Sequence, residues 1–176
     1  MKNNSSYFNC IFSILLILQS CNKSHPILSN AEKKAVVLEA KQTVQKIFQA
    51  SNKHNFLEGL DYYSADKDAY YTSNGEVSNF EELKNSYIQA GAMVEYLENT
   101  IASWNARCID KKTVIFTLPV HLKIKFMEVP EYNGQLIWSA VLQKIKGDWI
   151  VVQSHESWLN CVEVAEAFSK EVDKTL

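Results

Sequence analysis

The residues best suited to acid–base chemistry lie near the end of one predicted strand, at His155 and Glu156. The stretch 147–158 opens with a Gly-Asp turn and then alternates between two faces, which is typical of a β-strand. Strict alternation places His155 on the face of Trp149 and Val151, and Glu156 on the opposite face. Because the strand begins apolar and ends polar, we expect it to run from a core into the mouth of a pocket and to carry His155 there.

The ionisable candidates also have ordinary structural explanations. His155 bonded to a backbone or serine partner at a pocket rim would be structural, since position alone does not establish catalysis. Asp61 falls on a short predicted helix, where an acidic residue is normally exposed. His121 lies opposite the apolar face of its strand, which indicates an outer surface. Glu156 is either buried with a perturbed pKa or on a strand end that has left the core, and the second arrangement is more common.

Aromatic side chains from several predicted elements are suited to the walls of a pocket for a flat apolar ligand. We expect Tyr63, Tyr71, Trp104, Trp138 and His155 to line such a pocket. A pocket lining and a core face share the same alternation, so Tyr63, Trp104 and Trp138 fit a filled core equally well.

Composition and motif spacing argue against several function classes. Arg107 is the only arginine and the formal net charge is -2, so a nucleic-acid-binding surface is not expected. The four histidines are widely spaced and no cysteines are paired at ligand spacing, so we predict neither a metal site nor another cofactor. The five glycines stand singly, without a phosphate-binding loop. Cys108 and Cys161 could form one disulfide in an oxidising compartment, or could remain two separate buried thiols.

Residues 1–20 have the composition of a targeting segment, with Lys2 followed by an apolar run at 11–18. This run is too short for a membrane-spanning helix, which needs ~20 apolar residues. Residues 18–21, Leu-Gln-Ser-Cys, resemble a bacterial lipobox, and the resemblance implies that Cys21 is lipidated as the first residue after cleavage. Ordinary secretory cleavage is the alternative. We therefore expect a protein of the bacterial cell envelope that is lipid-anchored and either periplasmic or surface-exposed.

The rest of the chain is expected to be a tether at 21–29 and one domain at 30–176. Capping-box spacing predicts four helix starts, at Ser29 with Glu32, Asn55 with Glu58, Asn79 with Glu82, and Asn160 with Glu163. The first helix should run to about residue 51, and Gly91 should end the third in the C′ position.

From residue 93 the apolar pattern changes to period two and no helix is predicted until 160–174. We predict four long antiparallel strands, at about 93–109, 112–126, 135–146 and 148–158. Before them, Asn74-Gly75 predicts a type I′ turn in a short hairpin. Pro119 interrupts an otherwise regular strand and predicts a bulge or a local edge, because proline cannot donate to the ladder.

Helices followed by a run of antiparallel strands indicate an α+β fold with the helices on one face of the sheet. The order resembles the nuclear transport factor two-like superfamily, and in particular its SnoaL-like domains. Three segments carry the resemblance, Leu60–Thr72, Asn79–Leu83 and Gly147–Ser157, within a span of about 32–158. It implies a cone-shaped curved sheet with three N-terminal helices on its concave face and a pocket between them. The predicted C-terminal helix at 160–174 lies beyond the usual end of the family.

We expect this pocket to bind a small, mostly apolar ligand without catalysis, because the aromatic pattern comes without a recognisable acid–base pair. The resemblance also implies an alternative, since the superfamily includes isomerases, dehydratases and hydrolases. Such an enzyme would use His155 with Asp61 or Glu156, and two of these groups would have to converge in one pocket. A further alternative is a homodimeric interaction module that uses the outer sheet face around Ile115, Thr117, Ile137 and Val141.

Replacing Cys21 by alanine tests the predicted anchor. The variant should move from the membrane fraction to the soluble fraction, because the acyl chains would be attached at this residue. Cell fractionation followed by immunoblotting measures the shift, and unchanged membrane association would contradict the anchor.

Overall fold

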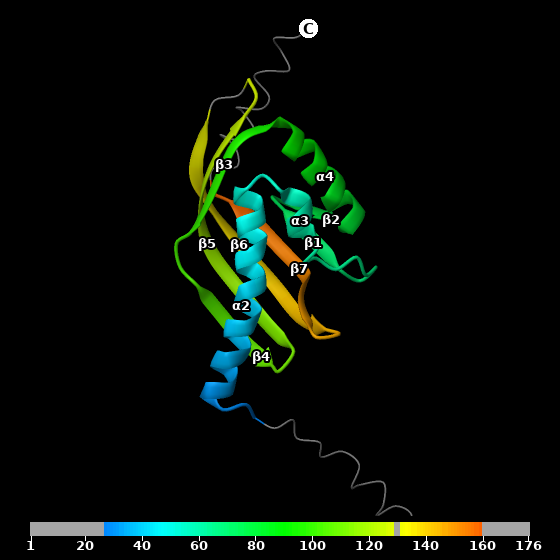
Figure 1. Ribbon diagram of the computed structural model, residues 1–176, viewed down its shortest axis with the longest axis vertical. Helices are drawn as coiled ribbons and strands as arrows, with labels where there is room; N and C mark the ends of the chain where they lie inside the picture. The colour runs from blue at the N-terminus through cyan, green and yellow to red at the C-terminus, as the bar shows by residue number, and fades with distance from the viewer. Residues whose placement is uncertain (1–26, 129–130, 160–176) are drawn as a thin grey trace, which may run out of the picture.

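The computed structural model describes residues 27–128 and 131–159 (Figure 1). The predicted signal peptide 1–20, Cys21, most of the tether and the predicted helix at 160–174 lie outside these residues. The described helices are α2 (Asn30–Asn52), α3 (Phe56–Leu60) and α4 (Phe80–Met93). The strands are β1 (Tyr70–Ser73), β2 (Glu76–Ser78), β3 (Val94–Ile101), β4 (Asn105–Asp110), β5 (Thr113–Phe126), β6 (Tyr132–Ile145) and β7 (Asp148–Trp158). None of the described helices is long and apolar enough to cross a membrane.

Two predicted capping boxes form, and the one predicted at Asn160 lies outside the described residues. At the start of α2, the Ser29 hydroxyl accepts from the Glu32 N–H at 3.3 Å, and the Glu32 carboxylate accepts from the Ser29 N–H at 2.9 Å. Asn79 and Glu82 make the same reciprocal pair at the start of α4, at 3.0 and 2.8 Å. Each box satisfies backbone donors that the first helical turn leaves unpaired, which is why both helices begin where the sequence predicts.

The box predicted at Asn55 does not form. The Asn55 side chain makes no capping bond to α3, and its amide instead donates to the Glu58 carboxylate at 2.5 Å. The reason is the backbone of Asn55, whose φ of -99° and ψ of 62° differ from the extended conformation of an N-cap residue. The helix itself is short and ends at Leu60, before Tyr63.

Gly91 does not end α4, because the helix continues to Met93. A Cβ atom at this position would lie 3.0 Å from the Cδ2 atom of the Phe56 ring. The glycine therefore permits a close approach between α4 and α3, and a sequence pattern alone does not distinguish that role from helix termination.

The strands form one seven-stranded sheet in the order β2-β1-β7-β6-β5-β3, with β4 also paired to β5. Most pairs are antiparallel, as predicted, but β1 and β7 are parallel, so the sheet is mixed. The turn between β1 and β2 has φ angles of +48° at Asn74 and +95° at Gly75, which fit the predicted type I′ turn. The strand predicted at 93–109 is in fact two strands, β3 and β4, which pair with successive parts of β5.

Pro119 marks the point at which β5 changes its partner from β4 to β3. Its carbonyl accepts from the Ala102 N–H at 2.9 Å, and residues 102–104 belong to neither strand. The N–H and C=O of a strand residue point to the same side, so the donor that proline lacks would face this gap. The local edge predicted at Pro119 is therefore present, and its missing N–H removes no ladder bond.

The helices α2, α3 and α4 lie on one face of the curled sheet (Figure 1). The inner face of β5 carries the centre of the core, with Val114, Phe116 and Leu118 each 0% exposed. Ala40 and Val44 of α2 belong to the same buried cluster. The predicted α+β fold, with helices packed on a curved sheet, is confirmed.

The opposite face of β5 and β6 points away from these helices. His121 is exposed on this face, as its position in the alternation predicted. Ile137 is 40% exposed there, and Ile115 and Val141 are half-buried neighbours in the ladder. The homodimer expected through this face stays a prediction.

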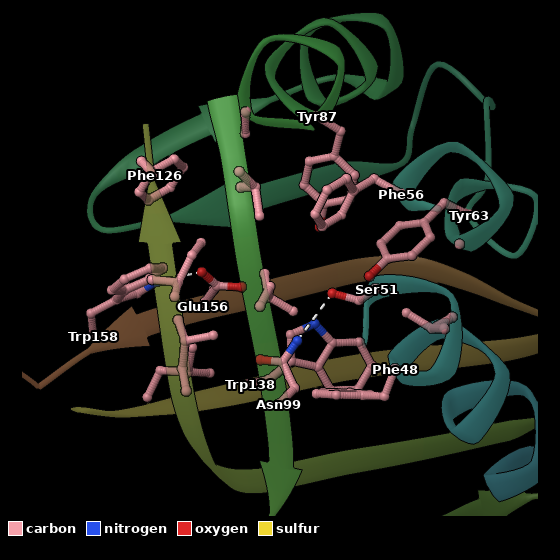
Figure 2. A pocket seen from close by; sticks show the side chains of 18 residues that line it. Phe48, Ser51, Phe56, Tyr63, Tyr87, Asn99, Phe126, Trp138, Glu156 and Trp158 are labelled. Carbon is pink, nitrogen blue, oxygen red and sulfur yellow. Dashed lines mark hydrogen bonds between the residues drawn. The ribbon is translucent and has the colours of Figure 1, made fainter. Parts of the chain in front are cut away.

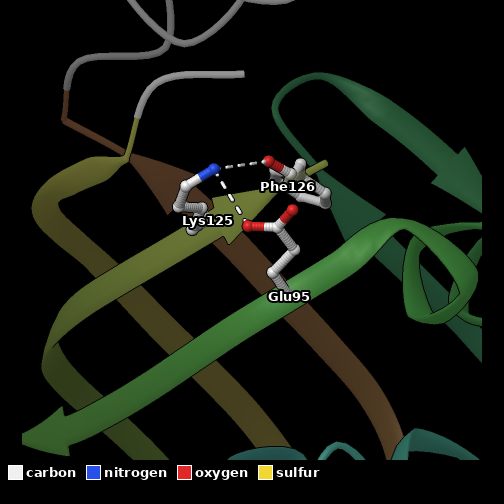
Figure 3. A network of polar contacts seen from close by, with 3 residues as sticks. All are labelled: Glu95, Lys125 and Phe126. Carbon is white, nitrogen blue, oxygen red and sulfur yellow. Dashed lines mark hydrogen bonds and ion pairs between the residues drawn. The ribbon is translucent and has the colours of Figure 1, made fainter. Parts of the chain in front are cut away.

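A bulge attaches the start of β3 to the end of β5. The ladder passes from Val94↔Phe126 to Tyr96↔Lys125, so Glu95 is an extra residue. The Glu95 carboxylate pairs with the Lys125 ammonium at 2.9 Å, and the same ammonium donates to the Phe126 carbonyl at 3.4 Å (Figure 3). Such a half-exposed pair contributes little free energy, but it orders the backbone beside Phe126.

Replacing Asn79 by alanine should lower the free energy of unfolding by about 1 kcal/mol, because the α4 cap is lost. Asn55→Ala is the matched control and should cost less than about half of that, since Asn55 makes no capping bond. Urea denaturation of the two variants measures both values. Equal losses would contradict the assignment of the caps.

Candidate functional site

An extra residue in β7 changes the phase of that strand. Leu142 of β6 pairs with Val151, and the neighbouring Val141 pairs with Gln153, so Val152 has no partner. An inserted residue of this kind shifts the alternation of side chains by one position. The two halves of β7 therefore present different sets of side chains to the helices.

The bulge places Glu156 on the inner face and His155 on the outer face. Val151 is 0% exposed before the bulge, and Ser154 is 8% exposed after it. Glu156 continues the inner face after Ser154, whereas His155 is exposed. The face assignment based on uninterrupted alternation is wrong for this half of the strand, because the apolar pattern does not reveal an inserted residue.

His155 forms a bond to β1 instead of facing the helices. Its Nδ1 atom lies 2.8 Å from Thr72 Oγ1, and that hydroxyl donates to the Ser154 carbonyl at 3.1 Å. Because the hydroxyl proton is already committed, Nδ1 acts as the donor to Thr72. The imidazole thus links the two parallel strands, which is a structural role.

A cavity of about 190 Å³ lies between the inner face of the sheet and the three helices (Figure 2). Most of its wall is apolar, and Ser51 and Asn99 occupy one side, bonded to each other at 3.0 Å. The aromatic members of the wall are Phe48, Phe56, Tyr63, Tyr87, Phe126, Trp138 and Trp158. An apolar enclosure with a few converging polar groups is the usual form of a small-molecule site.

Glu156 contributes a carboxylate to this aromatic wall (Figure 2). The Trp158 indole N–H donates to it. Burial raises the pKa of the Glu156 carboxyl above its ordinary value of 4.5, because the charged form loses its hydration. The hydrogen bond from Trp158 and the charge of His155 oppose part of this rise. The residue as a whole is half-buried, and the carboxyl group is its enclosed part.

Two tyrosines bring their hydroxyls into the same cavity (Figure 2). Burial is the largest cause that raises the pKa of Tyr63 and of Tyr87, and the negative charge of Glu156 raises both further. Both side chains therefore stay protonated, and each keeps its O–H donor group. The site thus combines one carboxylate with neutral donors.

A second and more polar cleft, of about 440 Å³, adjoins the cavity. Tyr87, Trp138 and Glu156 belong to the walls of both, so Glu156 stands where the two spaces meet. The rest of the cleft wall is rich in hydroxyl groups, with one further carboxylate at Glu76.

The structure brings together only some of the residues predicted to line the pocket. Tyr63 and Trp138 line the cavity, and Tyr71 lines the adjoining cleft. Trp104 lies elsewhere, under the ammonium of Lys41 at 4.1 Å and edge-on to Phe116. His155 is not part of either wall within the described residues.

Asp61 follows the end of α3 and is exposed, so it does not converge with His155 or Glu156. Within residues 27–128 and 131–159, no three His, Cys, Asp or Glu side chains lie close enough to hold a metal ion. Of the predicted ionisable groups, Glu156 alone reaches the cavity.

Several wall residues were not predicted from the sequence. Tyr87 and Phe56 lie on two of the predicted helices, but a helical pattern does not show whether an aromatic side chain faces a packed core or an unfilled space. Trp158 enters the cavity only because of the bulge at Val152. The one sequence signal for Trp158 is its position, because an aromatic residue two places after Glu156 lies on the same face of a strand.

Replacing Glu156 by glutamine should make the protein more stable at neutral pH. A raised pKa in the folded state means that the unfolded state releases this proton first, so stability falls as pH rises from about 4.5 through the folded-state pKa. Glutamine does not ionise, so it removes this loss of stability, and its amide oxygen can still accept the hydrogen bond from the Trp158 indole. Urea denaturation between pH 4 and 8 measures the difference, with the exposed Glu81→Gln as control, and a difference independent of pH would contradict the burial of the charge.

Comparison with known proteins agrees with this architecture. No curated protein sequence matches the chain. Among solved structures, a nuclear transport factor two-like superfamily protein from Salmonella enterica superimposes with a TM-score of 0.64 at 12% identity, covering 71% of this chain and 92% of that one. A ketosteroid isomerase-like protein from Erwinia carotovora gives 0.60 at 12% identity, with coverage of 70% and 95%. At these identities the likeness shows the fold alone.

A family model of the SnoaL-like domain matches residues 40–160, which is more than half of the chain and includes every wall residue of the cavity. The match includes the segments that suggested the resemblance in the sequence. The protein belongs to the SnoaL-like domain family.

Proposed function

We propose that the protein binds a small, mostly apolar molecule in the cavity between sheet and helices, and that Glu156 engages the polar group of this ligand. The observation that carries the proposal is an unfilled space with seven aromatic side chains and one enclosed carboxylate in its wall. A folding core alone gains nothing from either feature, since cavities and buried charges both lower stability.

The volume of the cavity limits the apolar part of the ligand. An apolar cavity of about 150 Å³ is enough to hold benzene. A space of about 190 Å³ therefore suits a single ring or a short branched chain. A larger ligand would extend past Glu156 into the polar cleft, which shares that side chain.

Binding is favoured over catalysis by the placement of the ionisable groups. The enzyme alternative required His155 to converge with Asp61 or Glu156, and both His155 and Asp61 are exposed outside the cavity wall. The neutral phenols of Tyr63 and Tyr87 can donate to a bound ligand, but they supply no second proton acceptor beside Glu156.

The proposed lipid anchor at Cys21 suits this placement of the site. The tether joins the N-terminal end of α2, whereas Ile47, Phe48 and Ser51 bring the other end of α2 to the cavity. A helix of this length separates its ends by roughly 30 Å. An anchored protein would therefore hold the cavity well away from the attachment point of its tether.

Filling the cavity tests the proposal. Ala90 lines it from α4, and Ala92 of the same helix is exposed and outside the wall. The probe 2-phenylethanol should bind the full chain and Ala92→Phe alike, and Ala90→Phe should weaken binding by at least about ten-fold, or ~1.4 kcal/mol. Tryptophan fluorescence measures binding, since Trp138 and Trp158 line the wall.

A thermal melt of each variant checks that it is folded, and native mass spectrometry of the untreated protein tests for a co-purified ligand. Equal binding by Ala90→Phe and Ala92→Phe would contradict the proposed site.

A further inference from the structure

We infer that the ligand of this cavity is a small apolar amine, bound as its ammonium cation against the carboxylate of Glu156. The inference rests on the proposed binding function and adds the chemical class of the ligand. Three features of the described residues support it: the charges of both walls, the partners of Glu156, and the aromatic surfaces around it.

The charges of the walls disfavour a ligand anion. The two adjoining spaces contain two carboxylates, Glu156 and Glu76, and no lysine, arginine or histidine among their described wall residues. An anionic ligand would lose its hydration in the cavity and would also be repelled by these carboxylates, and both effects cost free energy. The charges of the two walls therefore favour a neutral or a cationic ligand.

Among the described wall residues, no cationic side chain lies beside Glu156, and its chain neighbour His155 is on the outer face. The ion pairs found among the described residues join Glu95 to Lys125 and Glu39 to Lys144, and neither includes Glu156. The one side-chain hydrogen bond found for it comes from the Trp158 indole, which can only donate. A donor-only partner suits the ionised carboxylate, and an ionised carboxylate in an apolar enclosure is stabilised by a cation of opposite charge. A ligand ammonium would supply that cation.

The aromatic wall favours the same class of ligand. A cation near the face of a tryptophan or tyrosine ring is attracted by the negative charge of the π-system, most strongly where water is excluded. Trp138, Tyr63 and Tyr87 share the cavity with Glu156, and Trp158 bonds to its carboxylate. Aromatic rings placed around one carboxylate can bind an ammonium group jointly with that carboxylate. A neutral carbonyl ligand would instead use only one hydrogen bond, donated by a protonated Glu156.

The position of Glu156 orients such a ligand. It stands at the junction of the apolar cavity with the polar cleft. The ammonium group would lie at this junction, where Glu76 of the cleft adds a second negative charge. The apolar body would occupy the space bounded by Phe48, Leu122 and Ile124.

Three probes of similar size that differ in charge test the inference on the purified full chain. They are the cation 2-phenylethylammonium, the neutral 2-phenylethanol and the anion phenylacetate, titrated at pH 7.5 with tryptophan fluorescence as readout. The cation should bind at least about ten-fold more tightly than the alcohol, and phenylacetate more weakly than both.

The variant Glu156→Gln preserves the shape of the side chain and should remove the preference. It should weaken binding of the cation by about ten-fold and binding of the alcohol by a smaller factor, because the glutamine amide keeps an oxygen that accepts a hydrogen bond from a hydroxyl. The exposed Glu81→Gln controls for the change in net charge and should alter neither affinity.

The outcomes separate this inference from the proposed function. If the alcohol binds as tightly as the cation, or if Glu156→Gln leaves the cation affinity unchanged, the ligand is not an amine and the cavity remains a binding site. If no probe binds at millimolar concentration, the proposed function fails, and the inference fails with it.

Discussion

The unpaired residue in β7 is the constraint on which the site depends. Because Val152 has no partner on β6, the inner face passes from Val151 to Ser154 and then to Glu156. Had the alternation continued unbroken, the imidazole of His155 would face the helices and the carboxylate would face solvent. Bulges are frequent beside functional sites because they redirect a side chain without ending the strand. Here the bulge turns inward the one carboxylate that the described residues contribute to the cavity wall.

The domain separates the part that stabilises it from the part that holds the site. Around the middle of α2, Ala40 and Val44 are 0% exposed and pack in the cluster that includes Phe116 and Leu118 of β5. At the C-terminal end of the same helix, the wall encloses an empty volume of about 190 Å³ and a desolvated carboxyl group. Both features lower stability locally, and the dense packing next to them offsets that loss.

Shared architecture does not determine what such a cavity accepts. The two solved structures described above have the same fold as this chain, although their sequences are only 12% identical to it. Function on a common fold resides in the side chains of the site, so ligand preference here is argued from Glu156 and its aromatic neighbours. The same reasoning explains why His155, which is exposed and bonded to Thr72, is left out of the proposed site despite its favourable place in the sequence.

The sequence by itself determined the local features of the fold. Capping boxes located the starts of α2 and α4, Asn74-Gly75 located the hairpin turn, and the alternation of β5 identified its buried face. These features depend on interactions within a few residues of the chain, so a local pattern is enough to reveal them. Tertiary structure alone decided the role of Gly91, which depends on the distant ring of Phe56, and the parallel pairing of β1 with β7. It also decided that Glu156 faces the cavity, because the unpaired position of Val152 is defined by the register of β7 against β6, and a single strand contains no information about its register.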